Sequence, residues 1–422
     1  MKDRFLIGAA TAAHQVEGNN IHSDYWVSEH LKHSDFKEPS NEAVDHYHHY
    51  EEDIALMKQA GLNAYRFSIE WARIEPEEGK FSEEEMKHYE EVIAYCLEHD
   101  IEPIITLHHF SSPAWLISKG GWKAKDTPDR FAKYVKYVIE HIGDKVHYIC
   151  TINEANMGYQ LNKIAADMMK SRKKGKEGDV QVGVNIDMKN VLLSMFEQAR
   201  AFHCRLLRVN TFLNPRSLEE EKIVMEAHQK AKKVIKERYP DIKVGLSLSL
   251  FDYQPEEDGK ETAAQLWKED FGNYLPYIKD DDFLGVQNYS RKIVDANGPV
   301  TPGPETKLTQ MGYEYYPSSI GHVVEKVSKE FKGELLITEN GVATDKDEDR
   351  CAFIEEALVS VRQAKEKGVN VIGYLHWSLL DNFEWQAGYE KTFGLIAVDR
   401  KTMKRHAKNS LYTLGRIAKE MK

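Results

Sequence analysis

Two glutamates follow short apolar runs that are typical of buried strands. Glu339 comes directly after the run at 335–338 in LLITENGVAT, and Glu154 follows a similar run in ICTINEAN. A single carboxylate at the end of a strand is most often simply solvated. Two carboxyl groups that face one another can do more, because one can protonate a glycosidic oxygen while the other attacks the anomeric carbon or activates water. The pair is therefore the first candidate for chemistry.

Polar and aromatic side chains also lie in or just after the other apolar runs. They are Gln15, Arg66, His108, His109, Asn153, Tyr289, Trp377, Glu384 and Trp385. The set combines acids, neutral hydrogen-bonding groups and broad aromatic faces. Sugars present many hydroxyls and an apolar ring face, so the set indicates a carbohydrate pocket. The chain contains no H-E-x-x-H, no G-x-S-x-G and no phosphate-binding glycine loop.

Eight strand-like runs, alternating with longer helical patterns, must position these side chains. The runs are Phe5–Ala10, Ala64–Ile69, Ile101–Leu107, Val146–Ile152, Val244–Leu250, Phe283–Gln287, Leu335–Thr338 and Val371–Leu375. Clear helical spacing of apolar residues occurs at 43–60 and 83–99. The alternation predicts parallel strands with crossover helices, and eight units favour a single-domain (β/α)₈ TIM barrel over residues 1–422. A doubly wound open sheet is the alternative, but no G-x-G-x-x-G opens a helix.

A barrel would bring the candidate residues together. Enzymes of this architecture carry their active site at the carboxyl ends of the strands, where the loops after all eight strands meet. We therefore expect both glutamates and the other polar side chains to converge on one mouth.

Composition excludes several classes of partner. The chain has 422 residues with 57 Lys+Arg and 68 Asp+Glu, so its net charge of −11 argues against nucleic acid and anionic membranes. No apolar run approaches the roughly 18 residues of a membrane span. The N-terminal MKDRFLIGAATAAHQVEG has too short an apolar part for a signal peptide. Four widely spaced cysteines without a CxxC pair favour reduced thiols and a cytoplasmic location.

Four stretches give the chain a resemblance to family 1 of the glycoside hydrolases, the β-glucosidase and β-galactosidase family. FLIGAATAAHQVEG resembles the N-terminal signature of that family, and TINEAN resembles its acid/base segment. ITENG resembles the nucleophile segment, and WSLLDNFEWQAGYEKTFGLIAVD resembles the C-terminal signature. All four occur in order on the predicted strands, and the resemblance covers nearly the whole chain.

The resemblance implies a role for each candidate residue. Glu339 matches the nucleophile and Glu154 the general acid/base, while Arg66 and Tyr289 match the pair that contacts the nucleophile. The matches to sugar-contacting residues are Gln15, His109, Asn153 and Glu384, with Trp377 as the platform under the sugar, Trp385 as a neighbouring contact, and Trp122 and Phe393 as lining residues. The implied activity is a retaining exo-β-glycosidase that uses neither cofactor nor metal and removes a terminal β-glucosyl residue from a small glycoside or oligosaccharide.

Electrostatics supports these roles. Arg66 and Tyr289 would favour the carboxylate form of Glu339, so we expect its pKa to be lowered. Burial and the charge of Glu339 would raise the pKa of Glu154, which must begin protonated. The adjacent His108 and His109 would point to opposite faces of a strand, which disfavours a shared metal ion.

Departures from the family pattern affect specificity. Ala155 follows Glu154 where the family usually has proline, the segment at about 157–185 is unlike the family, and Gln287-Asn288 stands where Asn-Tyr is common. Glu384 would repel a sugar phosphate, so unphosphorylated sugars are favoured. A β-galactosidase, β-fucosidase or β-mannosidase, or a sugar-binding barrel without catalysis, remain alternatives. The sequence predicts no oligomeric state.

Overall fold

A computed structural model describes residues 4–173 and 188–421 of the chain. Its central sheet is entirely parallel and has the strand order β5-β4-β3-β2-β1-β12-β11-β8-β6. The strands are β1 (Leu6–Ala10), β2 (Ala64–Ser68), β3 (Glu102–Thr106), β4 (Tyr148–Cys150), β5 (Lys243–Gly245), β6 (Ser247–Ser249), β8 (Phe283–Gln287), β11 (Glu334–Asn340) and β12 (Val371–Trp377).

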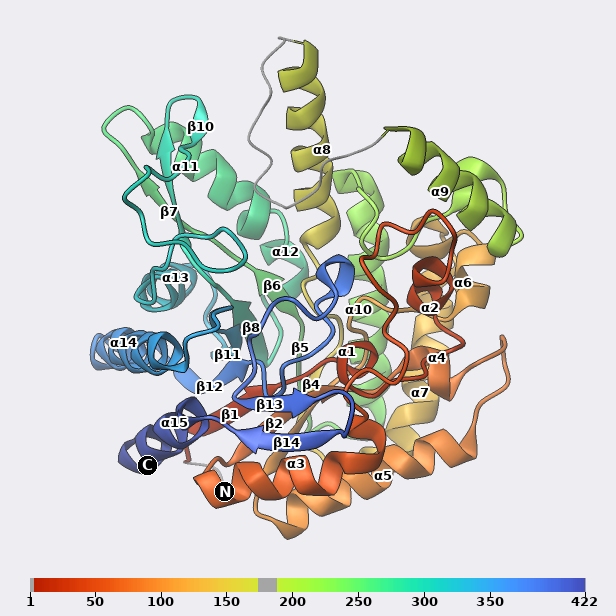
Figure 1. Ribbon diagram of the computed structural model, residues 1–422, viewed down its shortest axis with the longest axis horizontal. Helices are drawn as coiled ribbons and strands as arrows, with labels where there is room; N and C mark the ends of the chain where they lie inside the picture. The colour runs from red at the N-terminus through yellow and green to blue at the C-terminus, as the bar shows by residue number, and fades with distance from the viewer. Residues whose placement is uncertain (1–3, 174–187, 422) are drawn as a thin grey trace.

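The sheet closes into a barrel through one interrupted strand. The predicted run at 244–250 is divided at Leu246: its first half, β5, pairs with β4, and its second half, β6, pairs with β8. The carbonyl of Leu246 still accepts a hydrogen bond of 2.8 Å from Gly285, so the ladder continues across the break. Each predicted run contains a strand, and the predicted (β/α)₈ barrel is confirmed (Figure 1).

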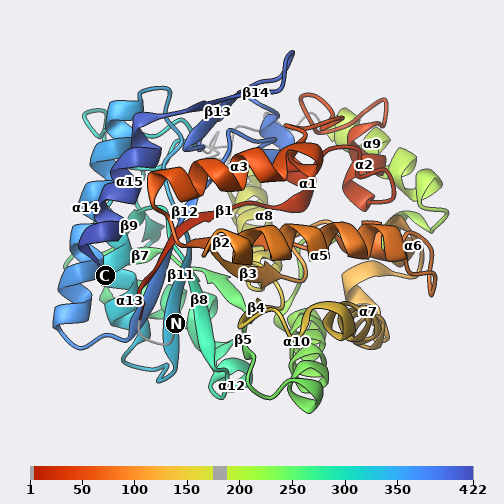
Figure 2. The same cartoon turned by 90° about the horizontal axis from the view of Figure 1, so that it is seen from below.

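Helices surround the strands on the outside (Figure 2). The longer ones are α3 (His46–Ala60), α5 (Glu83–Glu98), α7 (Thr127–Ile142), α10 (Leu218–Arg238), α13 (Ser319–Val327), α14 (Asp347–Glu366) and α15 (Asn409–Glu420). Helix α3 begins later than the predicted residue 43, because Ala43 and Asp45 have left-handed φ values of 49° and 51°. Helix α5 begins where predicted, since the hydroxyl of Ser82 caps its first turn.

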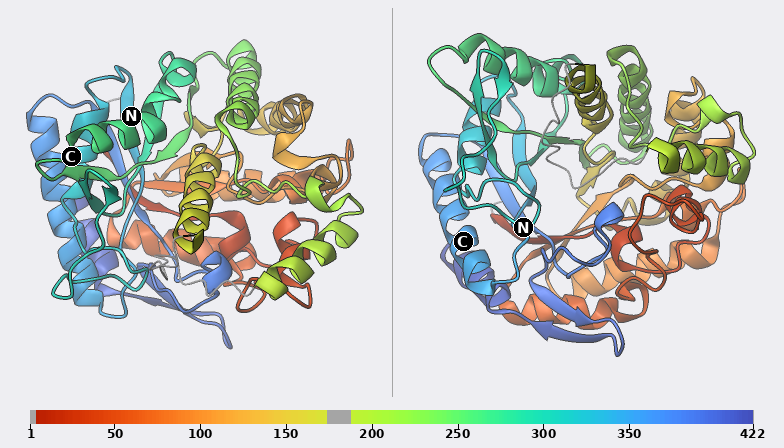
Figure 3. Two further views of the ribbon diagram at one scale, coloured as in Figure 1. Left: turned by 90° about the horizontal axis from the view of Figure 1, so that it is seen from above. Right: turned by 45° about the horizontal axis from the view of Figure 1, so that its top comes forward.

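Shorter elements and two further helices decorate the barrel. They are α1 (Ala13–Val16), α2 (Asp24–Glu29), α4 (Trp71–Ile74), α6 (Ala114–Ser118), α8 (Met157–Lys173), α9 (Met188–Ala201), α11 (Lys260–Trp267), α12 (Leu275–Ile278), the small sheet of β7 (Asp252–Pro255), β9 (Arg291–Asp295) and β10 (Gly298–Pro299), and the hairpin of β13 (Ile396–Asp399) and β14 (Lys404–Ala407). Helix α8 projects from the barrel, and α9 lies beside α2 (Figures 1 and 3).

The barrel interior changes from apolar to polar along the strands. Its apolar layer includes Leu6, Ala64, Ile104, Leu336 and Leu375. Because side chains alternate along a strand, residues two positions further on point to the same side. Three such residues are Arg66, Thr106 and Trp377, which therefore stand above this layer towards the carboxyl ends.

Two predicted strands end two residues later than expected, whereas β4 is two residues shorter than its predicted run at each end. Strand β11 runs to Asn340 and so includes Glu339, and β12 runs to Trp377 rather than to Leu375. In both cases the backbone pairing continues after the apolar side-chain pattern has ended, with a register irregularity between Ile337 and Glu339. The single-domain organisation stays a prediction. Among the helices of residues 4–173 and 188–421, none combines the length and the apolar character that a membrane span requires.

Candidate active site

Glu339 accepts three hydrogen bonds at the mouth of the barrel. The guanidinium of Arg66 donates to its Oε1 at 2.6 Å, and the amide of Gln287 donates to the same oxygen at 2.9 Å. The hydroxyl of Tyr289 donates to its Oε2 at 2.6 Å. Arg66 is held in turn by Thr106, whose hydroxyl accepts a hydrogen bond of 2.9 Å from Nε. Both Glu339 oxygens are thus fixed by donors from β2 and from the end of β8.

Asn153 connects this cluster to His109. Its Oδ1 accepts hydrogen bonds from Arg66 and Gln287 at 2.6 Å each and from Ser247 at 3.0 Å. Since Oδ1 is the acceptor, Nδ2 is the donor in the 3.1 Å contact with Nε2 of His109. Nε2 therefore carries the lone pair in neutral His109, and burial lowers the pKa of this imidazole well below its usual range.

Glu154 sits in the loop after β4 with a left-handed backbone. Its φ is 43°, a conformation that side chains other than glycine rarely adopt and that is often found at functional sites. The conformation is stabilised because the backbone N–H of Glu154 donates to the Ser247 hydroxyl at 3.0 Å, and the next N–H, of Ala155, donates to the Ser247 carbonyl at 2.9 Å. The Glu154 side chain is buried.

The two glutamates differ in what opposes the effect of burial. Burial raises the pKa of Glu154 well above its usual range, and the nearby charge of Glu339 raises it further, as predicted. Burial also raises the pKa of Glu339, although Arg66, Tyr289 and Gln287 all oppose the rise. The prediction of a lowered pKa for Glu339 was therefore wrong in its net direction, because it omitted desolvation. With three donors on Glu339, a proton shared by the pair belongs on Glu154.

A third acid lies on the loop after β12. Glu384 accepts a hydrogen bond of 3.3 Å from the amide of Gln15, which also donates to the carbonyl of Phe383 at 2.8 Å. Burial, with a contribution from the charge of Glu339, raises the pKa of Glu384 to about 8. Glu384 is therefore largely protonated near neutral pH, which weakens the argument that it repels a phosphate by its charge.

Aromatic rings form a wall beside these groups. Trp377 stacks on His109 with ring centroids 5.5 Å apart, and Trp385 stacks on the same imidazole at 6.3 Å. Phe393 meets the ring of Tyr289 edge-on at 6.1 Å. The structure thus brings these rings to the carboxylate cluster, where they can cover the apolar face of a ligand.

Trp122 is placed differently. It is fully buried, packs on His108 at 4.6 Å and on Phe212 at 5.0 Å, and donates from its indole nitrogen to the hydroxyl of Ser112. The observed contacts of Trp122 thus support the His108 ring. The role of Trp122 as a lining residue of the pocket stays a prediction. His108 bonds to Ser112 while His109 faces Asn153, so the two imidazoles serve different sides. Within the described residues, no group of three His, Cys, Asp or Glu side chains is arranged to hold a metal ion.

Sequence reasoning missed several residues of the site. Ser247 and Thr106 were not predicted because, in the sequence, each is an ordinary small polar residue within a strand. Gln287 was noted as a departure, but its direct contact with Glu339 was not anticipated. Tyr313 was also not considered: burial, with the charges of Glu154 and Glu384, raises its pKa to about 12.

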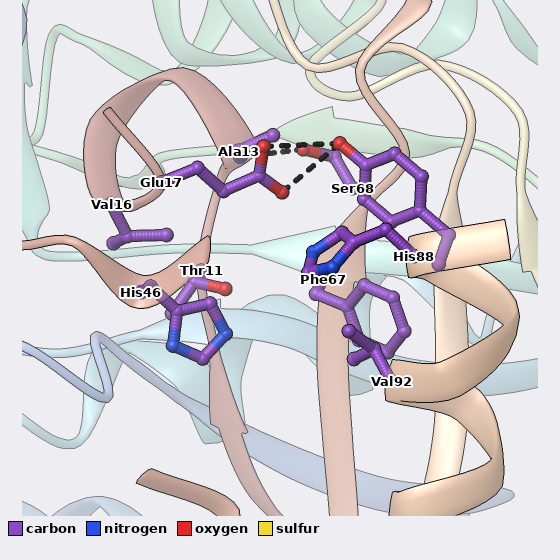
Figure 4. Close-up of a pocket in the computed structure, with 10 residues that line it drawn as sticks. Thr11, Ala13, Val16, Glu17, His46, Phe67, Ser68, His88 and Val92 are labelled. Carbon is purple, nitrogen blue, oxygen red and sulfur yellow. Dashed lines mark hydrogen bonds between the residues drawn. The ribbon is translucent and has the colours of Figure 1, made fainter. Parts of the chain in front are cut away.

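The N-terminal signature also builds a second polar cluster, outside the mouth. Glu17 accepts hydrogen bonds from Arg73 at 2.8 Å and from Tyr89 at 3.0 Å, and it is buried. Glu17, His46 and His88 converge on a cavity of about 10 Å³, room for one water molecule (Figure 4). No sugar fits there, so Glu17 has a structural environment although it is only two residues from Gln15.

The barrel and its buried acids, together with the comparisons below, define a glycoside hydrolase. The chain belongs to family 1 of these enzymes: the model of Glycosyl hydrolase family 1 matches residues 1–180 and 271–422. A 1,4-beta-D-glucan glucohydrolase of Thermotoga neapolitana is 31% identical over 98% of this chain and 97% of its own. A 6-phospho-beta-galactosidase of Clostridium acetobutylicum is 27% identical over 99% of this chain and 97% of its own.

Solved structures agree with this assignment. The crystal structure of beta-glycosidase BGL167 superposes with a TM-score of 0.89 at 38% identity, covering 99% of this chain and 96% of that one. Coverage of 99% of this chain includes most of the segment at 181–270 that the family model does not match. The family model itself extends to residue 180, so the expectation that the segment at about 157–185 is unlike the family was wrong for most of that segment.

Proposed function

We propose that the protein is a retaining exo-β-glycosidase that removes terminal, unphosphorylated β-glucosyl residues. The observation that carries the proposal is the unequal pair of buried acids. Glu339 is held by three donors that favour its ionised form, whereas burial and the charge of Glu339 keep the proton on Glu154. A nucleophile and a proton donor are the two groups that a double displacement requires.

In the first step Glu154 protonates the glycosidic oxygen while Glu339 attacks the anomeric carbon. The leaving group departs as an alcohol, and an ester joins the sugar to Glu339. Esterification removes the negative charge that raised the pKa of Glu154. Glu154 then accepts a proton from water, which attacks the same carbon and releases the sugar with its original configuration.

The remaining residues bind the sugar in this proposal. The second hydrogen on Nδ2 of Asn153 reaches the 2-hydroxyl, a contact that strengthens in the transition state. Trp377 covers the apolar ring face, while Gln15, His109 and Glu384 bond the other hydroxyls. The carbonyl oxygen of Gln15 has no partner within the described residues, and a hydroxyl would supply one.

The preference for an unphosphorylated sugar now rests on a different argument. A phosphate is normally bound by lysine or arginine. The pKa of Glu384 is shifted by burial first, then by the charge of Glu339 and the hydrogen bond from Gln15, and no lysine or arginine is among these causes. Glucose is favoured among the sugars because several relatives are named as glucosidases or glucan glucohydrolases.

We also propose a cytoplasmic location. All four cysteines are free, and Cys96 and Cys150 are buried as thiols. Fractionation of the native organism followed by activity assay tests this.

A panel of nitrophenyl β-glycosides tests the function. Purified protein should hydrolyse the β-glucoside with the highest kcat/KM, and the β-glucoside 6-phosphate should be at least tenfold poorer. Proton NMR during early turnover should show the β-anomer of glucose before mutarotation. Release of the α-anomer would reject the retaining mechanism, and inactivity on every glycoside of the panel would indicate a sugar-binding barrel without catalysis.

A further inference from the structure

Gln287 touches three residues of the site from the end of β8. Its Nε2 lies 2.6 Å from Oδ1 of Asn153, 2.9 Å from Oε1 of Glu339 and 3.1 Å from Oγ of Ser247. The side chain is completely buried. These partners belong to three different barrel units, so one amide joins the loop after β4 and the end of β11 to the first residue of β6.

The orientation of this amide is fixed by chemistry. Turning it over would place its oxygen against Oε1 of Glu339 and Oδ1 of Asn153, and both of these are acceptors. The nitrogen must therefore face them. It carries only two hydrogens for three neighbours, so one hydrogen is shared between acceptors.

Ser247 extends the connection to the acid. Its Oγ accepts from the backbone N–H of Glu154 at 3.0 Å and donates to Oδ1 of Asn153 at 3.0 Å. A continuous path of hydrogen bonds thus leads from the carboxylate of Glu339 through Gln287 and Ser247 to the backbone of Glu154. This backbone has the left-handed φ of 43°, and the path helps to hold it.

We propose that Gln287 is a positioning residue which, with Ser247, ties the nucleophile Glu339 to the loop that carries the acid Glu154. The inference rests on the proposed function of these two glutamates. When Glu339 becomes an ester its oxygen is a weaker acceptor, and the hydrogens of Gln287 then serve Asn153 and Ser247. The amide of Gln287 therefore holds the side chain of Glu339 most strongly in the free enzyme, in which Glu339 must be charged.

Length matters for this connection. Asparagine has a side chain that is one methylene shorter than that of glutamine, and a C–C bond is about 1.5 Å long. An asparagine here would lose at least one of the three partners of Gln287.

The test compares Gln287→Met with the native enzyme. Methionine fills a similar volume but donates no hydrogen bond. Loss of a donor to the carboxylate raises the pKa of Glu339, so the acidic limb of kcat/KM against pH should move upward by about half a unit to one unit, with kcat/KM falling about 10- to 100-fold. Gln287→Asn should give a smaller shift. Gln160→Met removes another buried amide, which donates to the Ser249 carbonyl at 2.9 Å, and should leave the limb in place.

A second readout does not depend on turnover. When the pKa of an acid is higher in the folded than in the unfolded protein, the free energy of unfolding falls as pH rises between the two values. In Gln287→Met this loss should continue to higher pH than in the native enzyme, which thermal melts from pH 4.5 to 8 would show. A native acidic limb together with native melts in the folded variant would overturn the inference. Inactivity of the native enzyme, by contrast, would reject the proposed function while the melts still test the contact.

Discussion

The molecule contains two buried clusters made of the same three residue types. In the mouth of the barrel, Glu339 accepts from an arginine and a tyrosine at 2.6 Å each, and behind β1 and β2, Glu17 accepts from an arginine at 2.8 Å and a tyrosine at 3.0 Å. Burial raises the pKa of both acids. The first cluster lies beside aromatic rings and the acids Glu154 and Glu384, whereas the second has Glu70 and Glu85 nearby and encloses a cavity of only about 10 Å³. A glutamate with an arginine and a tyrosine is thus not by itself a catalytic site.

The largest contrast should come from removing each glutamate. Glu339→Ala should lower kcat by a factor on the order of 10⁴ or more, because no other group can form the ester. Azide should restore turnover and give the α-glycosyl azide. Glu17→Gln should change kcat less than about threefold and instead lower the free energy of unfolding by up to roughly 3 kcal/mol, since buried Arg73 keeps only the more distant carboxylate of Glu85, at 3.8 Å. Near-native activity of Glu339→Ala would remove the distinction between the clusters.

The second prediction concerns Glu154, the acid of the loop after β4 that lies near the first cluster. Glu154→Ala should lower kcat/KM by about 10² to 10⁴ on substrates with poor leaving groups, since nothing else protonates the departing oxygen. Activated nitrophenyl glycosides should lose far less in the glycosylation step. Rates measured across a series of aryl glycosides would give a steep dependence on leaving-group pKa. An equal loss over the whole series would contradict the acid role.

Matched tyrosine variants should give a third, smaller difference. Tyr289→Phe removes a donor to the nucleophile and should lower kcat/KM by about 10- to 100-fold, because a hydrogen bond to a charged group contributes about 1.5–3 kcal/mol. Tyr89→Phe removes the equivalent donor from Glu17 and should cost about the same in unfolding free energy, with little change in kcat/KM. Parallel kinetics and urea unfolding measure both. Similar kinetic losses in the two variants would show that the clusters are coupled.

The smallest effect is a pH dependence of stability. Burial raises the pKa of Glu17 from 4.5 to about 7 in the folded protein. Between these values the folded state binds more protons than the unfolded state, so this group stabilises the fold below pH 4.5 and loses that contribution as pH rises through about 7. Glu17→Gln should remove this part of the dependence of unfolding free energy on pH, whatever the overall change in stability of the variant. Urea midpoints at pH 5 and pH 8 would show a smaller difference in the variant than in the native protein.

The comparison also explains what the sequence could and could not predict. Strand-like runs followed by acids located Glu154 and Glu339, because the fold brings all carboxyl strand ends to one place. Glu17 also lies in a stretch that resembles a family signature, but the first run ends seven residues earlier, at Ala10, and the resemblance gives Glu17 no catalytic role. The structure adds that Glu17 is enclosed, because the cavity beside it is also lined by His46 of α3, Phe67 of β2 and Tyr89 of α5.

Side-chain detail was less accessible. The path through Gln287 and Ser247 depends on which way an amide points and on the break in the fifth barrel strand, and neither leaves a trace in hydrophobic periodicity. Desolvation of Glu339 was underestimated for the same reason, since burial is a property of the assembled site. Trp122 shows the same dependence, because its packing on His108 and Phe212 is visible only in the assembled barrel.

The break at Leu246 has a wider consequence. The barrel closes where the two three-residue strands β5 and β6 follow one another. Ser247, the first residue of β6, also accepts a hydrogen bond from the backbone of Glu154. The same short segment therefore closes the barrel and positions the loop that carries Glu154. Heating that disrupts this closure should inactivate the enzyme before the rest of the barrel unfolds, so loss of activity should precede the loss of helical signal.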